Sequence, residues 1–125
     1  MLDLCAGTGE LSLQLAHRVG HGGYVLGIDF SPEMIAVAMD KLKEQRSVGI
    51  ILDHLIFRVG DALATGEPSG SYDFVTVAFG IRNVDGLDLF FKEARRVLKP
   101  GGKLLVIEFG QPKIPIFKTI FAFVS

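Results

Sequence analysis

Residues 1–11 read MLDLCAGTGEL, and this stretch decides the fold. The first four residues are apolar apart from Asp3, and the turn Ala6-Gly7-Thr8-Gly9 follows almost at once. A short apolar run that stops at glycines is typical of a buried strand that feeds a loop. From Leu11 to Val19 apolar residues recur every four positions, which predicts a helix. The order strand, glycine loop, helix indicates the beginning of an α/β unit.

The rest of the chain repeats this alternation of apolar runs and helical patterns. Ser31-Pro32-Glu33 is a strong helix start, because serine caps the first amides, proline suits the first helical position and glutamate faces the positive end of the dipole. Helical spacing returns from Leu87 to Leu98, and Lys99-Pro100-Gly101-Gly102 ends it. We therefore expect strands at 24–29, 55–59, 72–79 and 103–109, helices at 32–46 and 87–98, a loop at 62–71 and a helical tail at 114–124.

The predicted strands are apolar along their whole length, not at every second residue. Strands of that kind, alternating with helices, indicate a parallel sheet covered on both faces. Right-handed crossovers then give an α/β, Rossmann-like, doubly wound sheet with strand order 3-2-1-4-5. In such sheets a ligand binds beyond the carboxyl ends of the strands, where the order reverses. The candidate site therefore combines residues 5–10, Asp29, 60–62 and 78–85.

Length and composition narrow the function classes. The chain has 125 residues, 49% of them hydrophobic, which fits one globular domain and excludes a second. Its formal net charge of -1 offers no broad basic surface, so we expect no nucleic-acid partner. One cysteine and three scattered histidines give neither a disulfide nor zinc-ligand spacing, so we expect no metal. No apolar run reaches the roughly 20 residues of a membrane span and no signal peptide is visible, which favours a cytoplasmic protein.

The turn at 7–9 has the residue types of a nucleotide-binding loop. Gly7 and Gly9 let a ligand approach the backbone, and the helix that follows offers unpaired amides at its start. Such a loop suits a dinucleotide or a nucleoside. The dinucleotide fingerprint asks for glycine or alanine at the third small position, where this chain has Ser12. A tight turn without a ligand is the alternative interpretation.

Two aspartates follow the second and third strands at the same edge. Asp29 lies 20 residues after Gly9, where a carboxylate can accept hydrogen bonds from both ribose hydroxyls and would repel a 2'-phosphate. Asp61 can accept from an adenine amino group, while the amide of Ala62 donates to a ring nitrogen. The alternatives are a solvated acid at a helix entry for Asp29 and a turn aspartate bonded to its own backbone for Asp61.

Five segments together carry a family resemblance: LDLCAGTGEL at 2–11, GIDFSPEM at 27–34, GDA at 60–62, VTVAFGIRNV at 75–84 and RRVLKPGGKLLVIEF at 95–109. With them the chain resembles the class I S-adenosylmethionine-dependent methyltransferases, and more narrowly the ubiquinone and menaquinone biosynthesis methyltransferases, which C-methylate a polyprenylated quinol ring. The resemblance implies S-adenosyl-L-methionine as cofactor, in contact with Thr8, Asp29, Asp61 and Ala62. It also implies a class I methyltransferase core that lacks the last strands, so we expect the single domain at 1–125 to be incomplete at both ends.

The chemistry of the implied substrate suggests the catalytic residues. A ring carbon becomes nucleophilic when the adjacent phenol is deprotonated or polarised, so a cation or donors are needed near the developing oxyanion. Arg82 and Asn83 follow the fourth strand at the ligand edge. We expect Arg82 to stabilise the phenolate and Asn83 to orient the ring, with no metal involved. The alternative for Arg82 is an ion pair with a surface acid such as Asp85.

The resemblance favours methyl transfer to a demethylated polyprenyl quinol, either demethylmenaquinol or a ubiquinone precursor. The alternatives are a class I methyltransferase for another small molecule, an NAD-dependent oxidoreductase, which Ser12 and Asp61 disfavour, and a module that only binds nucleosides or other proteins. A lipid-soluble quinol also implies peripheral contact with a membrane. For the apolar tail at 114–124 a helix packed on the sheet is the favoured interpretation, and a lid or membrane-surface helix that receives the quinol is the alternative.

Overall fold

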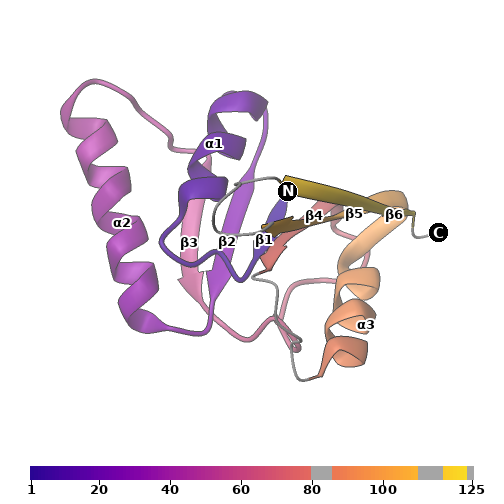
Figure 1. Ribbon diagram of the computed structural model, residues 1–125. Helices are drawn as coiled ribbons and strands as arrows, with labels where there is room; N and C mark the ends of the chain where they lie inside the picture. The colour runs from indigo at the N-terminus through magenta and orange to yellow at the C-terminus, as the bar shows by residue number, and fades with distance from the viewer. Residues whose placement is uncertain (80–85, 110–116, 124–125) are drawn as a thin grey trace.

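Six strands and three helices make up the part of the chain that the structure describes, residues 1–79, 86–109 and 117–123 of this computed structural model. In chain order they are β1 (Leu2–Leu4), α1 (Glu10–Val19), β2 (Val25–Asp29), α2 (Pro32–Ser47), β3 (Leu55–Val59), β4 (Tyr72–Phe79), α3 (Leu87–Val97), β5 (Leu98–Phe109) and β6 (Phe117–Phe123). Figure 1 shows the strands between α2 at one side and α3 at the other.

The strands form one sheet in the order β3-β2-β1-β4-β5-β6, and the first five of them are parallel. β1 lies inside the sheet, with Asp3 opposite Gly27 of β2 on one side and Thr76 of β4 on the other. The predicted order 3-2-1-4-5 is therefore confirmed. The order reverses between β1 and β4, where a doubly wound sheet offers its ligand site.

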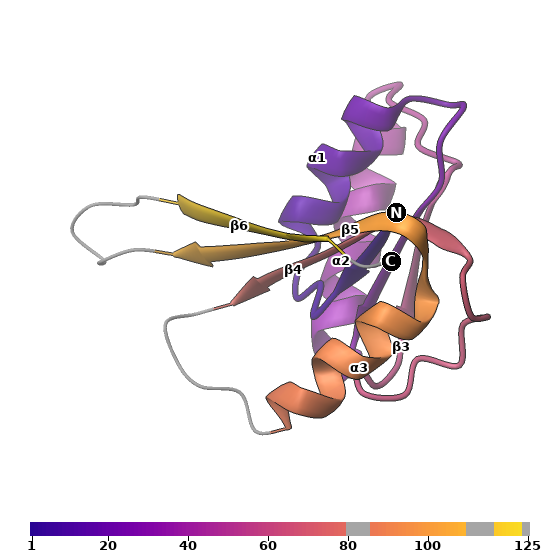
Figure 2. The ribbon, with the colours of Figure 1, turned by 90° about the vertical axis from the view of Figure 1, so that its right-hand side faces the viewer.

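The chain from 117 to 123 differs from the prediction. These residues form a strand, not the predicted helix: β6 pairs antiparallel with β5, from Phe117 opposite Phe109 to Phe123 opposite Lys103. Figure 2 shows the two strands side by side. A short apolar run fits helical and strand spacing alike, and the edge of β5 supplies backbone partners that favour the strand. The sheet thus has a sixth strand beyond the five predicted, and the predicted helix, whether packed on the sheet or at a membrane surface, is wrong over this stretch.

The start of β5 also differs from the prediction. The strand begins at Leu98, so the proline and two glycines that were expected to precede it lie inside it. Pairing with β4 is irregular here, because Leu98 lies opposite Tyr72 while Lys103 lies opposite Phe74. Gly101 has a φ of 79°, which lets the additional residues of β5 bulge out between these pairs.

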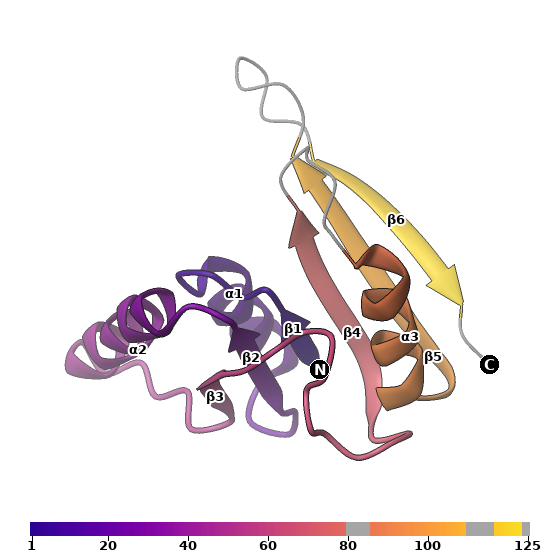
Figure 3. The same cartoon turned by 90° about the horizontal axis from the view of Figure 1, so that it is seen from below.

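Each face of the sheet has its own hydrophobic core. One core joins α1 and α2, with Ala16 and Ala38 packed against strand residues that include Val25. The other joins α3, whose Phe90 packs with strand residues that include Leu26. Val25 and Leu26 are neighbours in β2 and enter different cores, because successive side chains of a strand point to opposite faces. Figure 3 shows α1 and α2 over the β1–β3 half of the sheet and α3 beside β4 and β5.

The helices bury only part of their apolar residues. In α3, Phe90 is buried, whereas Phe91 is 39% exposed and meets the Phe90 ring edge to face. In α2, Ile35 is buried and the neighbouring Met34 is exposed. Within the described ranges, no helix has the length and apolarity needed to cross a membrane.

Candidate functional site

The carboxyl ends of the first four strands meet at one edge of the sheet. β1 ends at Leu4 between β2, which ends at Asp29, and β4. β3 lies next to β2, and the amide of Gly60 just after β3 donates to the carbonyl of Asp29 at 2.9 Å. Parallel pairing thus brings the loop at 5–9, Asp29 and the segment 60–62 to one edge, as the sequence predicts.

The loop at 5–9 is a tight turn in which Cys5, Gly7 and Gly9 have φ values of 58°, 58° and 89°. The amide of Gly9 donates to the carbonyl of Ala6 at 3.0 Å, which closes the turn. A Cβ at Gly9 would lie 2.8 Å from Cζ of Phe57, whereas a Cβ at Gly7 would meet nothing within 4 Å. Gly9 is therefore required by packing, and the open side of the loop is at Gly7.

Asp29 ties this loop to α2. Its Oδ2 accepts a hydrogen bond from the amide of Gly7 at 2.8 Å, and its Oδ1 accepts one from the amide of Ser31 at 2.9 Å. Ser31 is the N-cap of α2, so Asp29 lies at a helix entry, but it is half-buried and holds the glycine loop, unlike the solvated acid of the alternative interpretation. A carboxylate has about four acceptor positions, so about two remain for other donors. The ribose role stays a prediction that this geometry permits.

Asp61 begins a short turn after β3. Its Oδ1 accepts from the amide of Leu63 at 2.8 Å, and its carbonyl accepts from the amide of Ala64 at 3.0 Å. The interpretation as a turn aspartate bonded to its own backbone is confirmed for that oxygen. Asp61 is exposed, and Ala62 beside it is half-buried against the core on the α3 side. The carboxylate keeps acceptor positions that face solvent, and the adenine role stays a prediction.

Thr8, in the same loop, is half-buried. Its hydroxyl donates to Oε2 of Glu10 at 2.5 Å, and the other Glu10 oxygen pairs with Lys41 of α2. Lys41, with a smaller contribution from Thr8, lowers the pKa of Glu10 to about 2. The start of α1 has no side-chain cap, so its first amides keep the donor capacity that a helix start offers.

A buried carboxylate lies under the loop, and the sequence analysis did not single it out. Asp3 is 1% exposed; its Oδ2 accepts from the hydroxyl of Ser12 at 2.5 Å and its Oδ1 from that of Thr76 at 3.0 Å. Burial raises the pKa of Asp3 to about 6, although both hydroxyls act to lower it. The sequence did hold one signal for this site, because a charged residue within a buried apolar strand needs hydrogen-bond donors.

The same contact explains why Ser12 departs from the dinucleotide fingerprint. Its hydroxyl is held by Asp3, and its side chain lies against β2 at Gly27, where a Cβ would come 2.8 Å from Oγ of Ser12. The close approach of helix and strand that a third glycine gives elsewhere is obtained here by a glycine in the strand.

The pKa of the Cys5 thiol reflects the negative charge at this edge of the sheet. Burial and then the carboxylates of Asp29, Asp3 and Asp61 raise its pKa to about 11. Three negative groups therefore act together on one point beside the glycine loop. A site with such a potential favours a cationic ligand over an anionic one.

The predicted catalytic residues Arg82 and Asn83 lie outside the described residues, as does Asp85. Ala78, near the end of β4, is half-buried. Within the described part of the chain, no group of three or more His, Cys, Asp or Glu residues could hold a metal ion.

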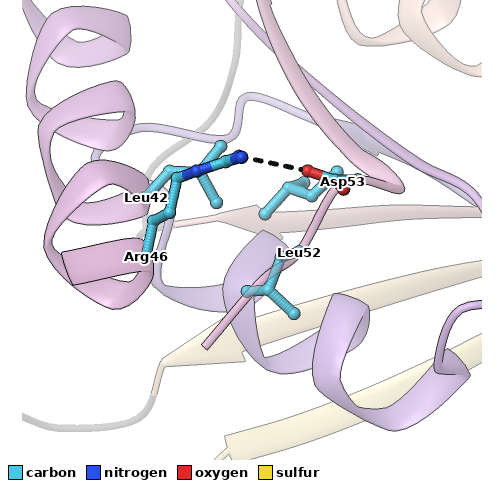
Figure 4. A pocket seen from close by; sticks show the side chains of 5 residues that line it. Leu42, Arg46, Leu52 and Asp53 are labelled. Carbon is cyan, nitrogen blue, oxygen red and sulfur yellow. Dashed lines mark hydrogen bonds and ion pairs between the residues drawn. The ribbon is translucent and has the colours of Figure 1, made fainter. Parts of the chain in front are cut away.

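A small pocket of about 150 Å³ lies at the opposite end of β3. Figure 4 shows Leu42 and Arg46 of α2 facing Leu52 and Asp53, and its dashed line marks the ion pair between Arg46 and Asp53. Ligand sites usually measure about 300 Å³ or more and lie at the carboxyl edge of such a sheet. This pocket is therefore not the candidate site.

Several solved structures of similar fold are methyltransferases. A SAM dependent methyltransferase from Aquifex aeolicus aligns with a TM-score of 0.78 and 26% identity, over 91% of this chain and 60% of that one. Geranyl diphosphate C-methyltransferase from Streptomyces coelicolor A3(2), solved with S-adenosyl-L-homocysteine, aligns with a TM-score of 0.70 and 30% identity, over 86% of this chain and 37% of that one.

Sequence comparison gives the family. The demethylmenaquinone methyltransferase of Shouchella clausii (strain KSM-K16) is 41% identical over 122 residues, which cover 98% of this chain and 50% of that protein. The chain spans about half the length of the curated relatives it matches. The sequence pattern of one family matches all residues from 1 to 125. The chain therefore belongs to the ubiE/COQ5 methyltransferase family.

Proposed function

We propose that this chain carries the S-adenosyl-L-methionine site of an enzyme that methylates a ring carbon of a demethylated polyprenyl quinol. The observation that carries the proposal is the set of carboxylates at the switch point: Asp29 and Asp61 keep acceptor positions, and with Asp3 they add to the effect of burial that raises the pKa of Cys5. S-adenosyl-L-methionine brings a positive sulfonium and an ammonium group to such an edge. The pyrophosphate of NAD would bring negative charge, which the same carboxylates repel.

The residues present fit the nucleoside part of this cofactor. Asp29 accepts the two ribose hydroxyls with the positions that Gly7 and Ser31 leave open. Asp61 accepts from the adenine amino group, and the amide of Ala62 donates to the ring. The open space at Gly7 admits the ligand beside the backbone of the loop, next to Thr8.

Arg82 and Asn83 supply the proposed chemistry toward the substrate. The bound cofactor supplies an electrophilic methyl group. Arg82 stabilises the phenolate that makes the ring carbon nucleophilic, and Asn83 orients the ring. Both follow β4, whose carboxyl end lies at the cofactor edge. The relative from Shouchella clausii is named for demethylmenaquinone, which supports this substrate class, and a polyprenyl chain implies peripheral contact of the protein with a membrane.

A binding titration tests the cofactor assignment. We expect S-adenosylhomocysteine to bind the parent protein and NAD to bind far more weakly. Asp29→Ala removes charge-assisted hydrogen bonds of about 1.5 to 3 kcal/mol and should weaken S-adenosylhomocysteine binding by roughly 10- to 100-fold. Asp53→Ala is the matched control, because Asp53 is an exposed acid at the other end of β3. Tighter binding of NAD, or equal affinity in Asp29→Ala and the parent, would refute the proposal.

A methyl-transfer assay with demethylated quinol tests the substrate. Arg82→Met should abolish most of the turnover while cofactor affinity stays at the parent level, because Arg82 is assigned to the phenolate and not to the nucleoside. Unchanged turnover in this variant would remove the assigned role.

A further inference from the structure

The turn at 61–64 carries the proposed adenine contacts. Because the turn is short, the residues at its two ends determine its position. At its start, the amide of Gly60 is held by the carbonyl of Asp29 at 2.9 Å. Within it, Asp61 and Ala64 form an isolated bridge. At its end stands Thr65, which is 3% exposed. The position of Asp61 relative to the glycine loop therefore depends on what holds Thr65.

Thr65 is held by one carboxylate of α3. Oε2 of Glu93 accepts both the amide of Thr65 at 2.8 Å and its hydroxyl at 2.6 Å. The carbonyl of Thr65 accepts from Arg58 at 2.9 Å, and its hydroxyl accepts from the amide of Glu67 at 3.1 Å. Every polar group of this buried residue is thus engaged, and two of its four bonds end on a single oxygen atom.

Glu93 is itself fixed in direction. Arg96 donates to both of its oxygens, from Nε at 2.7 Å and from a terminal nitrogen at 2.8 Å. Arg96 also donates to the carbonyl of Glu67 and to the hydroxyl of Ser69. Glu93 is 7% exposed, and Arg96 lowers its pKa to about 2, so the carboxylate stays ionised at neutral pH. A bidentate pair of this kind restricts a carboxylate to one orientation.

No helix crosses between β3 and β4 in the described structure, so these contacts replace the packing that a crossover helix would give the segment 60–71. The side chain of Leu63 reaches the start of α3, where a Cβ at Gly86 would lie 3.2 Å from it. The segment is therefore joined to α3 at two levels, near Gly86 and at Glu93. A shift of Glu93 would move Thr65 and, four residues earlier, Asp61.

We propose that Glu93 is a positioning residue for adenine recognition, which acts through Thr65 to hold the Asp61–Ala64 turn against the nucleoside. This inference rests on the proposed function, because it needs an adenine at Asp61. Glu93 touches neither cofactor nor substrate in this scheme. Its effect is on which base the turn accepts, since a hydrogen bond to the amino group is lost when the donor and acceptor drift beyond about 3.5 Å.

The test compares two nucleoside ligands that differ at the base. S-inosylhomocysteine has an oxo group where S-adenosylhomocysteine has the amino group that Asp61 accepts. The full protein should prefer the adenosyl ligand by about ten-fold or more, because a charge-assisted hydrogen bond is lost in the inosyl ligand. Glu93→Gln should reduce this preference about five-fold or more, by weakening adenosyl binding rather than inosyl binding. A merely stabilising residue would leave the ratio of the two affinities unchanged.

Matched variants separate positioning from folding. Glu67→Gln removes a charge from the same polar network without touching the amide or hydroxyl donors of Thr65, so it should keep the preference. Thr65→Val removes the hydroxyl bond to Glu93 and should lose part of the preference, while Thr65→Ser restores it. Thermal unfolding shows whether each variant is folded. If Glu93→Gln is not folded, the base preference of Thr65→Val tests the positioning role instead.

The outcomes are distinct. A parent-like preference in a folded Glu93→Gln or Thr65→Val protein would overturn the positioning role. An equal loss of preference in Glu67→Gln would overturn it as well, because the effect would then belong to the network as a whole. A parent protein that binds S-adenosylhomocysteine without distinguishing the base would refute the adenine assignment to Asp61, and with it this inference. A parent that binds neither ligand would refute the proposed function.

Discussion

Gly7 and Gly9 stand two residues apart in one turn, yet their surroundings differ. Both have positive φ, so alanine at either position costs about 1 to 2 kcal/mol of backbone strain. At Gly9 the new Cβ would also meet Phe57 at 2.8 Å and Ala38 at 2.9 Å, which adds about 1 to 3 kcal/mol. Alanine is therefore strained at both positions, but it overpacks the core only at Gly9.

Alanine substitutions at these glycines should therefore separate stability from binding. We expect Gly9→Ala to lower the free energy of unfolding by about 2 to 5 kcal/mol and Gly7→Ala by about 1 to 2 kcal/mol, measured by chemical denaturation. Gly7→Ala should nevertheless weaken S-adenosylhomocysteine binding, because its methyl group enters the open side of the loop. Equal losses of stability in the two variants would contradict the packing role of Gly9.

The buried carboxyl of Asp3 should make stability depend on pH in a direction that is unusual for an acid. Its pKa is about 6 in the folded protein, above the ordinary 3.8 of an aspartate, so the folded state holds the proton more tightly. Its contribution to stability is complete below about pH 4 and is lost as the pH rises through 6, by about 3 kcal/mol. Asp3→Asn should remove this component, so the stability of the variant relative to the parent should increase from pH 4 to pH 7.

Thr76→Val provides the control for that pH dependence. The hydroxyl of Thr76 lowers the pKa of Asp3, so its removal should move the pH window upward. Denaturant titrations at several pH values measure both effects. A difference between Asp3→Asn and the parent that stays constant with pH would show that Asp3 does not titrate in this range.

Among the elements, α2 has the best-defined start. The hydroxyl of Ser31 accepts from the amide of Met34 at 3.2 Å, and Pro32 occupies the first helical position. Ser31→Ala should cost about 1 kcal/mol of folding stability. Ser47→Ala, at the last residue of the same helix, removes an exposed hydroxyl bond to a carbonyl and should cost less than about 0.5 kcal/mol. Similar losses from the two variants in thermal unfolding would argue against the cap.

Local patterns predicted most of these elements because their signals are local. The cap at Ser31, the apolar stripe of α3 and the glycine turn after β1 depend on residues within one or two helical turns. The start of β5 and the strand at 117–123 depend instead on pairing partners far along the chain. Leu98 joins the sheet because Tyr72 lies opposite it, and no neighbour of Leu98 reveals that.

The same division holds for the candidate site. Asp29 and Asp61 are found by their place at strand ends and their spacing from the glycine loop. The role of Asp3 is not predicted from local patterns, because its hydrogen-bond donors are Ser12, nine residues away, and Thr76, 73 residues away. The double role of Asp29, as anchor of the loop and as free acceptor, likewise depends on where its two oxygens lie, which spacing alone does not tell.

At the scale of the whole molecule, two cores share one sheet. Phe90 is among the largest fully buried side chains of the α3 side. Phe90→Ala should cost about 3 to 5 kcal/mol, whereas Phe91→Ala, which truncates a partly exposed ring, should cost about 1 kcal/mol. Because β2 contributes to both cores, we expect α1, α2 and α3 to unfold in a single transition in Phe90→Ala. Separate transitions in circular dichroism and hydrogen exchange would contradict this coupling.

The place of β1 inside the sheet has a consequence for synthesis on the ribosome. β1 precedes β4 in the chain, yet the two are neighbours, and Asp3 bonds to Thr76 across 73 positions. The residues Leu2–Leu4 and the turn that follows them therefore leave the exit tunnel long before the strand that completes their surroundings. In the nascent chain the edge of β1 that faces β4 has no partner strand until then, and an exposed strand edge is a surface that a chaperone can cover. The bond of the glycine loop to Asp29 can form early, whereas the bond from Thr76 to the buried Asp3 beneath the loop forms only after residue 76 has emerged.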